Sequence, residues 1–360
     1  MEVNIESNNT KPHELTVNTS TKCKSTYLRD FLGIENSSVL SKIYKNVGID
    51  TKNTTRGRSK ELDWSDCRKI LSHRGYNLEK EAVVLSYFVN KGGVGKSTLA
   101  YLTSLSLSMV GLRVLCIDTD SQGNTTETYP LTDQGYTINE MTPVLLDVIE
   151  SKTRREEAKV KDIRDCIIEY SESLHIMPST IMNQNISDDL LKQFNKNTSS
   201  IFKTIIDPIK KDYDVIIVDC APNLLTLNAS ISCASDLVIM PSIPHPFSKA
   251  GLEQTDELLN EVAEDFKLNR IARKVLFNKH HSGKSLTHKY LGEIAATYTD
   301  ELLSTVLKEN AEYARVVDEH ANPFSEKGYK YIGKEILSLA KEIIELPELQ
   351  FKTVEKSTLH

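Results

Sequence analysis

The chain has 360 residues, with 44 Lys and Arg against 50 Asp and Glu, which gives a formal net charge of −6. At roughly 150 residues per domain, this length predicts two domains. The charge balance and an apolar fraction of 39% exclude a collagen-like chain, a largely disordered chain and a uniformly basic nucleic-acid coat. The sequence has no apolar run of about 18 residues. Its polar N-terminus has no apolar signal segment, so we expect a cytoplasmic protein without a membrane span.

Positive charge is concentrated near the N-terminus. Residues 20–80 contain 13 Lys and Arg but only 7 Asp and Glu, a local balance of +6, so the rest of the chain sums to −12. A basic section attached to an acidic body indicates a polyanionic partner. Residues 1–22 are polar and show no periodicity, which predicts a mobile arm.

Short helical patterns follow this arm. Apolar residues recur at helical spacing over 26–34, 37–49 and 64–76, with serine or aspartate at the expected starts of the second and third helices. A turn-rich basic stretch, TKNTTRGRSK, separates the second pattern from the third. These features predict a small, mainly helical domain over residues 23–80.

From residue 83 onward, short apolar runs alternate with helical patterns. The runs are nearly continuous, as in parallel strands that are covered on both faces, and they span 83–89, 113–118, 174–178, 214–219, 236–241 and 273–278. The helical patterns span 97–110, 187–195, 199–211, 224–234, 248–266, 309–318 and 330–346. This alternation predicts an α/β domain over residues 81–346, with a doubly wound and mostly parallel sheet, followed by a polar tail over 347–360.

A glycine-rich loop lies between the first of these strands and its helix. Residues 86–102 read SYFVNKGGVGKSTLAYL. Small residues let the backbone N–H groups turn inward, and the helix N-terminus adds free donors, so the loop predicts a cradle for a β-phosphate. Lys96 would supply a positive charge to the β- and γ-phosphates, Ser97 a hydroxyl to Mg²⁺, and Thr98 a hydrogen bond near the α-phosphate.

The loop departs from the usual spacing G-x-x-x-x-G-K-[ST]. Asn90 stands where that spacing has its first glycine, and Lys91 directly precedes Gly92 and Gly93. The loop therefore carries two lysines, one at each end.

Carboxylates end two further strand candidates. Asp219 follows the run DVIIV, where a carboxylate is placed to hold Mg²⁺. Asp118 and Asp120 follow RVLCI, and Asp120 leads into the polar loop SQGNTT. We expect Asp120 to orient an attacking water and Asp118 to act through hydrogen bonds.

These segments carry a family resemblance. KGGVGKST, DTDSQGN and IIVDCAP, in this order and strand context, resemble the ParA/MinD family of deviant Walker A ATPases over residues 83–346. The resemblance implies ATP and Mg²⁺ as ligands and an ATP-sandwich homodimer, in which Lys91 reaches the partner's nucleotide. It assigns Lys96, Ser97, Asp120 and Asp219 to the phosphate, Mg²⁺, water-positioning and Walker B positions. Asn278 matches the position that reads the adenine edge. The nucleotide-binding set is then Lys91, Gly92, Gly93, Val94, Gly95, Lys96, Ser97, Thr98, Asp219 and Asn278.

The N-terminal section is similar to that of type Ia plasmid-partition ParA proteins, which carry a winged helix-turn-helix and repress their own operon. By that similarity Lys42 and Lys45 lie on a recognition helix, and Arg56, Arg58 and Lys60 contact phosphates or the groove. The alternative is a helical dimerisation domain with solvated lysines. A second, non-specific DNA surface would use lysines near the C-terminus, with candidates Lys279, Lys284, Lys289, Lys327, Lys330 and Lys334.

The resemblance implies a DNA-partition ATPase that is associated with the nucleoid. ATP builds the dimer, the dimer binds DNA, and slow hydrolysis, stimulated by a ParB-type partner, releases it. One alternative is a MinD-like membrane-cycling protein, which needs an amphipathic basic C-terminal helix. Another is a transcriptional repressor that senses nucleotide. A third is an enzyme that uses the same loop for electron transfer or carboxylate amidation. Iron–sulfur use would need a cysteine at the dimer face, and none of the six cysteines stands in such a context.

Overall fold

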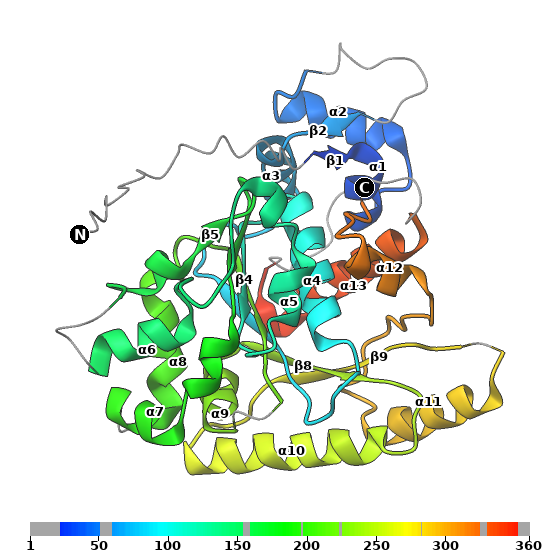
Figure 1. Ribbon diagram of the computed structural model, residues 1–360. Helices are drawn as coiled ribbons and strands as arrows, with labels where there is room; N and C mark the ends of the chain where they lie inside the picture. Colours follow the sequence, from blue (N-terminus) through cyan, green and yellow to red (C-terminus); the bar gives the residue numbers. More distant parts are fainter. Residues whose placement is uncertain are drawn as a thin grey trace, which may run out of the picture.

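A seven-stranded sheet forms the centre of the protein in the computed structural model (Figure 1). The structure describes residues 22–50, 60–153, 159–195, 197–222, 225–281, 283–324 and 330–351. The strand order is β5-β6-β4-β7-β3-β8-β9, and only β5 is antiparallel to its neighbour. The expected α/β class with a mostly parallel sheet is confirmed. The strands are β3 Val83–Tyr87, β4 Val114–Asp118, β5 Ile168–Glu169, β6 Leu174–Met177, β7 Val215–Asp219, β8 Leu237–Ser242 and β9 Arg273–Phe277.

Helices cover both faces of this sheet. Alternate residues of each strand enter two separate cores, as Val83 and Leu85 of β3 do on one face and Val84 on the other. One core holds residues of α1 Ser25–Phe31, α2 Ser37–Asn46, α3 Trp64–His73, α4 Lys96–Met109, α12 Glu312–Asp318 and α13 Lys330–Ile344. The other holds residues of α6 Leu145–Thr153, α7 Asp188–Phe194, α8 Ile201–Ile206, α9 Leu225–Ala234, α10 Ser248–Asp265 and α11 Ser285–Thr297. A short helix, α5 Asn124–Thr128, follows β4.

All six strands expected from the apolar runs are present, with ends within two residues of the expected ones. The sequence patterns did not predict β5, α6 or α11. Strand β5 has two residues and a partly exposed pattern. In α11 only Thr287 and Ile294 are buried, so that helix has no continuous apolar stripe to reveal it.

The N-terminal section packs on the α4 and α13 face of the sheet. Its three expected helices are present, and strands β1 Cys23–Lys24 and β2 Glu61–Leu62 form a separate antiparallel pair. Tyr27 of α1 contacts Phe324 edge-to-face, with ring centroids 5.9 Å apart. A Cβ on Gly111, just after α4, would lie 2.7 Å from the backbone nitrogen of Arg68 in α3. The section thus shares one hydrophobic core with the sheet.

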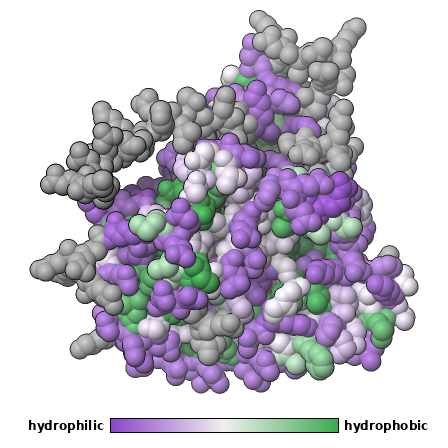
Figure 2. Space-filling model, in the orientation of Figure 1, coloured by the Kyte–Doolittle hydropathy of each residue, from purple (hydrophilic) through white to green (hydrophobic). Residues whose placement is uncertain are grey.

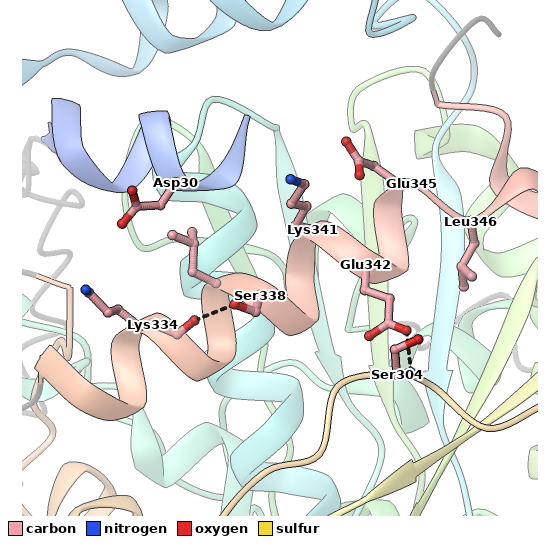
Figure 3. A pocket seen from close by; sticks show the side chains of 9 residues that line it. Asp30, Ser304, Lys334, Ser338, Lys341, Glu342, Glu345 and Leu346 are labelled. Atoms are coloured by element: carbon pink, nitrogen blue, oxygen red, sulfur yellow. Dashed lines mark hydrogen bonds between the residues drawn. The ribbon is translucent and has the colours of Figure 1, made fainter. Parts of the chain in front are cut away.

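A cavity of about 700 Å³ lies along this contact. Figure 3 shows Asp30 of α1 facing the side of α13 that carries Lys334, Ser338 and Lys341. At the other end of the cavity, the Glu342 carboxylate accepts hydrogen bonds from the backbone N–H groups of Ser304 and Thr305, the latter at 2.8 Å. Asp30 of the N-terminal section therefore faces a charged side of α13 across this cavity.

The expected polar tail begins with packed residues. Leu349 and Phe351 are buried, and the Phe351 carbonyl accepts the backbone N–H of Asn77 at 2.7 Å. The Lys80 ammonium lies 4.7 Å from the centre of the Phe351 ring. Residues 347–351 thus close the core against the N-terminal section, whereas residues 352–360 lie outside the described residues.

Asp214→Asn is expected to lower the free energy of unfolding by about 3 kcal/mol, because it breaks a buried charge cluster. The Asp214 side chain is 1% exposed and accepts hydrogen bonds from Arg68 at 3.1 Å and Arg113 at 3.0 Å. Denaturant unfolding measures the loss. The control is Asp212→Asn, whose carboxylate is half-exposed in its pair with Arg164 and should change stability by less than about 1 kcal/mol. Equal losses of stability in the two variants would refute the role of Asp214 in joining Arg68 to Arg113.

Candidate functional site

The glycine-rich loop connects β3 to α4 at the carboxyl edge of the sheet. Gly93 and Gly95 have φ angles of 73° and 96°, which glycine adopts without strain. A Cβ on Gly95 would lie 2.8 Å from Nδ2 of Asn278. The backbone therefore curls tightly and enters α4 directly, where the unsatisfied N–H groups of the first turn form an anion site.

Lys96 is the first residue of α4 and is 9% exposed. Its Nζ donates to the main-chain carbonyls of Lys91 at 3.1 Å and Val89 at 3.5 Å. The loop carbonyls thus hold the ammonium group over the loop. A positive charge fixed there, beside free N–H groups, is suited to a polyphosphate.

Two carboxylates end the neighbouring strands. Asp118 of β4 and Asp219 of β7 are paired in register, and both are buried. Burial raises the pKa of each carboxyl above the ordinary value of 3.8, and the charge of Asp219 raises the pKa of Asp118 further. A cation, hydrogen-bond donors or protonation of one carboxyl group can stabilise two carboxylates so placed.

Asp118 uses its oxygens to fix the loop that follows β4. It accepts the backbone N–H of Thr126 at 2.9 Å, the Thr126 hydroxyl at 2.7 Å and the backbone N–H of Asp120 at 3.0 Å. This geometry agrees with the hydrogen-bonding role expected for Asp118. Nothing in the sequence singled out Thr126, which lies eight residues after Asp118 and reaches it only through the fold of the loop.

Asp219 keeps one oxygen free. Its Oδ2 accepts the Thr125 hydroxyl at 2.7 Å, whereas Oδ1 is buried and has no hydrogen-bond partner within the described residues. The hydroxyls of Ser97 and Thr125 and the charge of Lys96 lower the pKa of Asp219 and offset part of the burial effect. An unpaired buried carboxylate oxygen next to a serine hydroxyl fits Mg²⁺ and its water shell. The residues present therefore suit the expected metal.

One cavity of about 570 Å³ brings most of the expected residues together. It is lined by Gly92, Gly93, Gly95, Lys96, Ser97, Thr98, Asp120, Asn124, Glu127, Thr128, Pro222, Val317, Asp318 and His320. The Asp120 carboxylate lines it while accepting the backbone N–H of Gln122 at 3.0 Å. Val317, Asp318 and His320 come from the end of α12 and its following turn. No local sequence signal points to them, because only packing brings α12 to the loop.

Four residues of the expected nucleotide-binding set do not line the cavity, namely Lys91, Val94, Asp219 and Asn278. The Lys91 ammonium donates to the Ser248 hydroxyl at 2.9 Å. The Asn278 amide donates to the carbonyl of Val94 at 2.9 Å and accepts the backbone N–H of Lys279 at 2.8 Å. Asn278 thus ties the loop to the end of β9. Its adenine contact stays a prediction.

The residues expected to touch DNA are only partly described. Lys42 and Lys45 are exposed on α2, three residues apart. Lys60 contacts the carbonyl of Asp50, and its ammonium lies 5.4 Å from the centre of the Tyr44 ring. Arg56 and Arg58 lie outside the described residues. Lys42 and Lys45 are therefore the clearest candidates for a DNA contact.

The fold and the loop together define a P-loop nucleoside triphosphatase with a mostly parallel sheet. The model of one AAA domain family, AAA_31, matches residues 82–272, just over half of the chain. The chain belongs to this AAA domain family. Residues 22–81 lie outside the matched range.

Relatives of this chain include proteins that carry the ParA name. Soj, the sporulation initiation inhibitor protein of Bacillus subtilis, is 26% identical over 254 residues, 70% of this chain and 94% of Soj. The virulence plasmid ParA family protein pGP5-D of Chlamydia psittaci is 24% identical over 261 residues, 72% of this chain and 93% of that protein. The expected ParA/MinD type of P-loop ATPase is thus confirmed at family level.

A solved structure supports the same fold. A McdA variant from Cyanothece in complex with ATP has a TM-score of 0.62 at 18% identity and covers 77% of this chain and 100% of that chain. At this identity the likeness shows the fold alone.

Proposed function

We propose that this chain is an ATPase for DNA partition of the ParA kind. It binds Mg²⁺ and ATP, dimerises around the nucleotide, binds DNA as a dimer and hydrolyses ATP slowly. One observation carries the proposal: a single loop holds Lys91 and Lys96 at its two ends, and the neighbouring strands place Asp120 and Asp219 at the same edge of the sheet.

Each group has a role in this proposal. Lys96 and the loop N–H groups bind the phosphates, Thr98 stabilises them, and Asp120 orients the attacking water. Ser97 and Asp219 hold Mg²⁺, which neutralises charge on the β- and γ-phosphates when bound. Lys91 leaves its own chain to reach the nucleotide of the partner subunit. Asn278 keeps the loop in place and contacts adenine.

Asp219→Asn is expected to remove the Mg²⁺ dependence of ATP binding while leaving Mg²⁺-free binding within about threefold of wild type. The free Oδ1 of Asp219 is the buried oxygen available to the metal shell. Calorimetry with a non-hydrolysable ATP analogue, with Mg²⁺ and with EDTA, measures both values. Because a buried carboxylate with a raised pKa opposes folding, the amide should not lower the melting temperature. Unchanged Mg²⁺ dependence would contradict this assignment.

The N-terminal section supplies the operator contact in this proposal. Lys42 and Lys45 lie on one exposed face of α2. Binding of operator DNA to this face represses the partition operon. Non-specific DNA binding uses other lysines of the dimer. Of the candidates, Lys279 reaches the Gly93 carbonyl at 3.2 Å, Lys284 and Lys289 pair with Glu309 and Glu293, and Lys334 lines the cavity beside α1. Lys327 lies outside the described residues.

The proposed partners are a second copy of the chain and a ParB-type centromere-binding protein that accelerates hydrolysis. The proposed location is the cytoplasm, on nucleoid DNA. The ParA-family relatives, one of them a virulence plasmid protein, support this assignment. Hydrolysis without the partner is expected to be slow.

Lys42→Ala/Lys45→Ala is expected to weaken operator binding on the order of tenfold at moderate salt and to reduce the salt slope of log K by about 2, because two phosphate contacts are lost. Gel-shift titration at several salt concentrations measures both quantities. The control is Lys69→Ala/Lys22→Ala, which removes the same charge from other parts of the section. A double variant with unchanged affinity and slope would refute a DNA contact of α2. Deletion of residues 1–80 is a poorer test, since it removes Arg68 and exposes the shared core.

The membrane-cycling alternative finds no support in the described residues. Among these, no helix has the length and apolar character needed to span a bilayer. Of the described apolar side chains, the two nearest the C-terminus, Leu349 and Phe351, are buried in the core and are not presented as a membrane anchor.

A nucleotide-sensing repressor is the second candidate. The favouring observation is that α4 begins at Lys96 in the phosphate loop and ends where α3 of the N-terminal section packs on it, near Gly111. One helix thus connects the two sites. Non-specific DNA binding that requires ATP would favour partition, whereas operator binding alone would favour the repressor.

A further inference from the structure

Lys91 is engaged by its own chain at the start of α10. Its Nζ donates to Ser248 Oγ at 2.9 Å and lies 3.4 Å from Nδ1 of His245. That ring nitrogen also accepts the backbone N–H of Phe247 at 3.3 Å, so it faces Lys91 as an acceptor. Within the described residues no carboxylate pairs with Lys91, and burial lowers its pKa.

The contact has a fixed geometry. Ser248 is 3% exposed and is the first residue of α10, and its backbone N–H donates to the His245 carbonyl at 2.9 Å. A Cβ on Gly251 would lie 3.5 Å from Lys91 Cβ, so the lysine stem lies along the first turn of α10. The turn carrying both acceptors is therefore packed directly against the loop.

The position is also electrostatically poor for an ammonium group. The N-terminus of an α-helix carries a partial positive charge, which repels a cation. Two hydrogen bonds hold Lys91 where the α10 dipole opposes it. A triphosphate offered by a partner subunit would be the stronger site for this charge.

We propose that Ser248 and His245 form a resting latch that holds Lys91 away from the partner's nucleotide, and that dimerisation must open it. The proposal rests on the function proposed above, in which Lys91 acts across the dimer. Ser248 and His245 are positioning residues, because they act through Lys91. Since each subunit opens its own latch, the effect on the dimer dissociation constant is the square of the effect on one subunit.

The first test measures the latch without nucleotide. Reductive methylation of the full chain, followed by peptide mass spectrometry, gives the modification rate of Lys91. Ser248→Ala and His245→Ala should raise this rate severalfold, whereas Ser248→Thr, which keeps the hydroxyl, should retain the wild-type rate. Lys203, an exposed lysine of α8, serves as the internal standard, and Ser285→Ala, at the first position of α11, is the matched control. Unchanged Lys91 rates in both variants would overturn the latch.

The second test measures dimerisation with Mg²⁺ and a non-hydrolysable ATP analogue by sedimentation. If Ser248→Ala raises the fraction of subunits with a released Lys91 about threefold, the dimer dissociation constant should fall by about ninefold. Faster modification with an unchanged dissociation constant would also overturn the proposal, because the contact would not limit dimerisation. A wild-type chain that never dimerises with the analogue would refute the proposed function instead, while the modification rates still decide whether Lys91 is held.

Discussion

Lys96→Ala is expected to abolish ATP hydrolysis, with at least about a hundredfold loss of rate. The Lys96 ammonium is almost fully buried and is held over the loop by two carbonyls. No other lysine or arginine lines the described cavity around the loop. Its removal leaves the phosphates without their fixed positive charge, so nucleotide affinity should fall as well. Phosphate release and calorimetric ATP binding measure the two effects.

The control for this prediction is Lys203→Ala. Lys203 is an exposed lysine of α8, paired with Asp207, and its loss should leave the rate within about twofold of wild type. Circular dichroism of both variants tests that the fold is retained. A Lys96→Ala protein with the wild-type rate would overturn the assignment of the loop as a phosphate site.

Lys91→Ala is expected to separate nucleotide binding from turnover. The Lys91 side chain lies beside the cavity, on Ser248, so a monomer should bind ATP within about threefold of wild type. Dimerisation and hydrolysis should fall by at least about a hundredfold, because the charge that the partner's nucleotide requires is gone. Sedimentation, phosphate release and calorimetry on one preparation give the three values.

Asn90→Ala is the matched control, since Asn90 is the exposed neighbour of Lys91. It should dimerise and hydrolyse ATP like the wild type. Normal turnover and dimerisation of Lys91→Ala would contradict the sandwich arrangement, and loss of ATP binding by Lys91→Ala would place the lysine in its own subunit's site.

Lys96→Ala and Lys91→Ala should therefore impair different steps of the ATPase cycle. Lys96 serves the nucleotide of its own chain and its loss should affect binding, whereas Lys91 serves the nucleotide of the partner and its loss should affect only steps that need two subunits. This difference separates an ATP-sandwich dimer from a monomeric ATPase, which would use both lysines in one site.

The sequence by itself determined the sheet and the phosphate loop. Six apolar runs became the six main strands because buried parallel strands need continuous apolar segments. Gly93 and Gly95 fixed the curl of the loop through backbone geometry that other residues adopt only under strain. Asp118 and Asp219 could be assigned to one edge of the sheet because the carboxyl ends of parallel strands lie together.

Only the tertiary structure decided which distant groups meet at that edge. Lys91 contacts Ser248, which is 157 residues away, and Asp219 contacts Thr125, which is 94 residues away. The end of α12 lines the cavity, and the N-terminal section shares a core with α4 and α13. Such contacts depend on how helices pack on the two faces of the sheet, and a local pattern of residues carries no information about that packing.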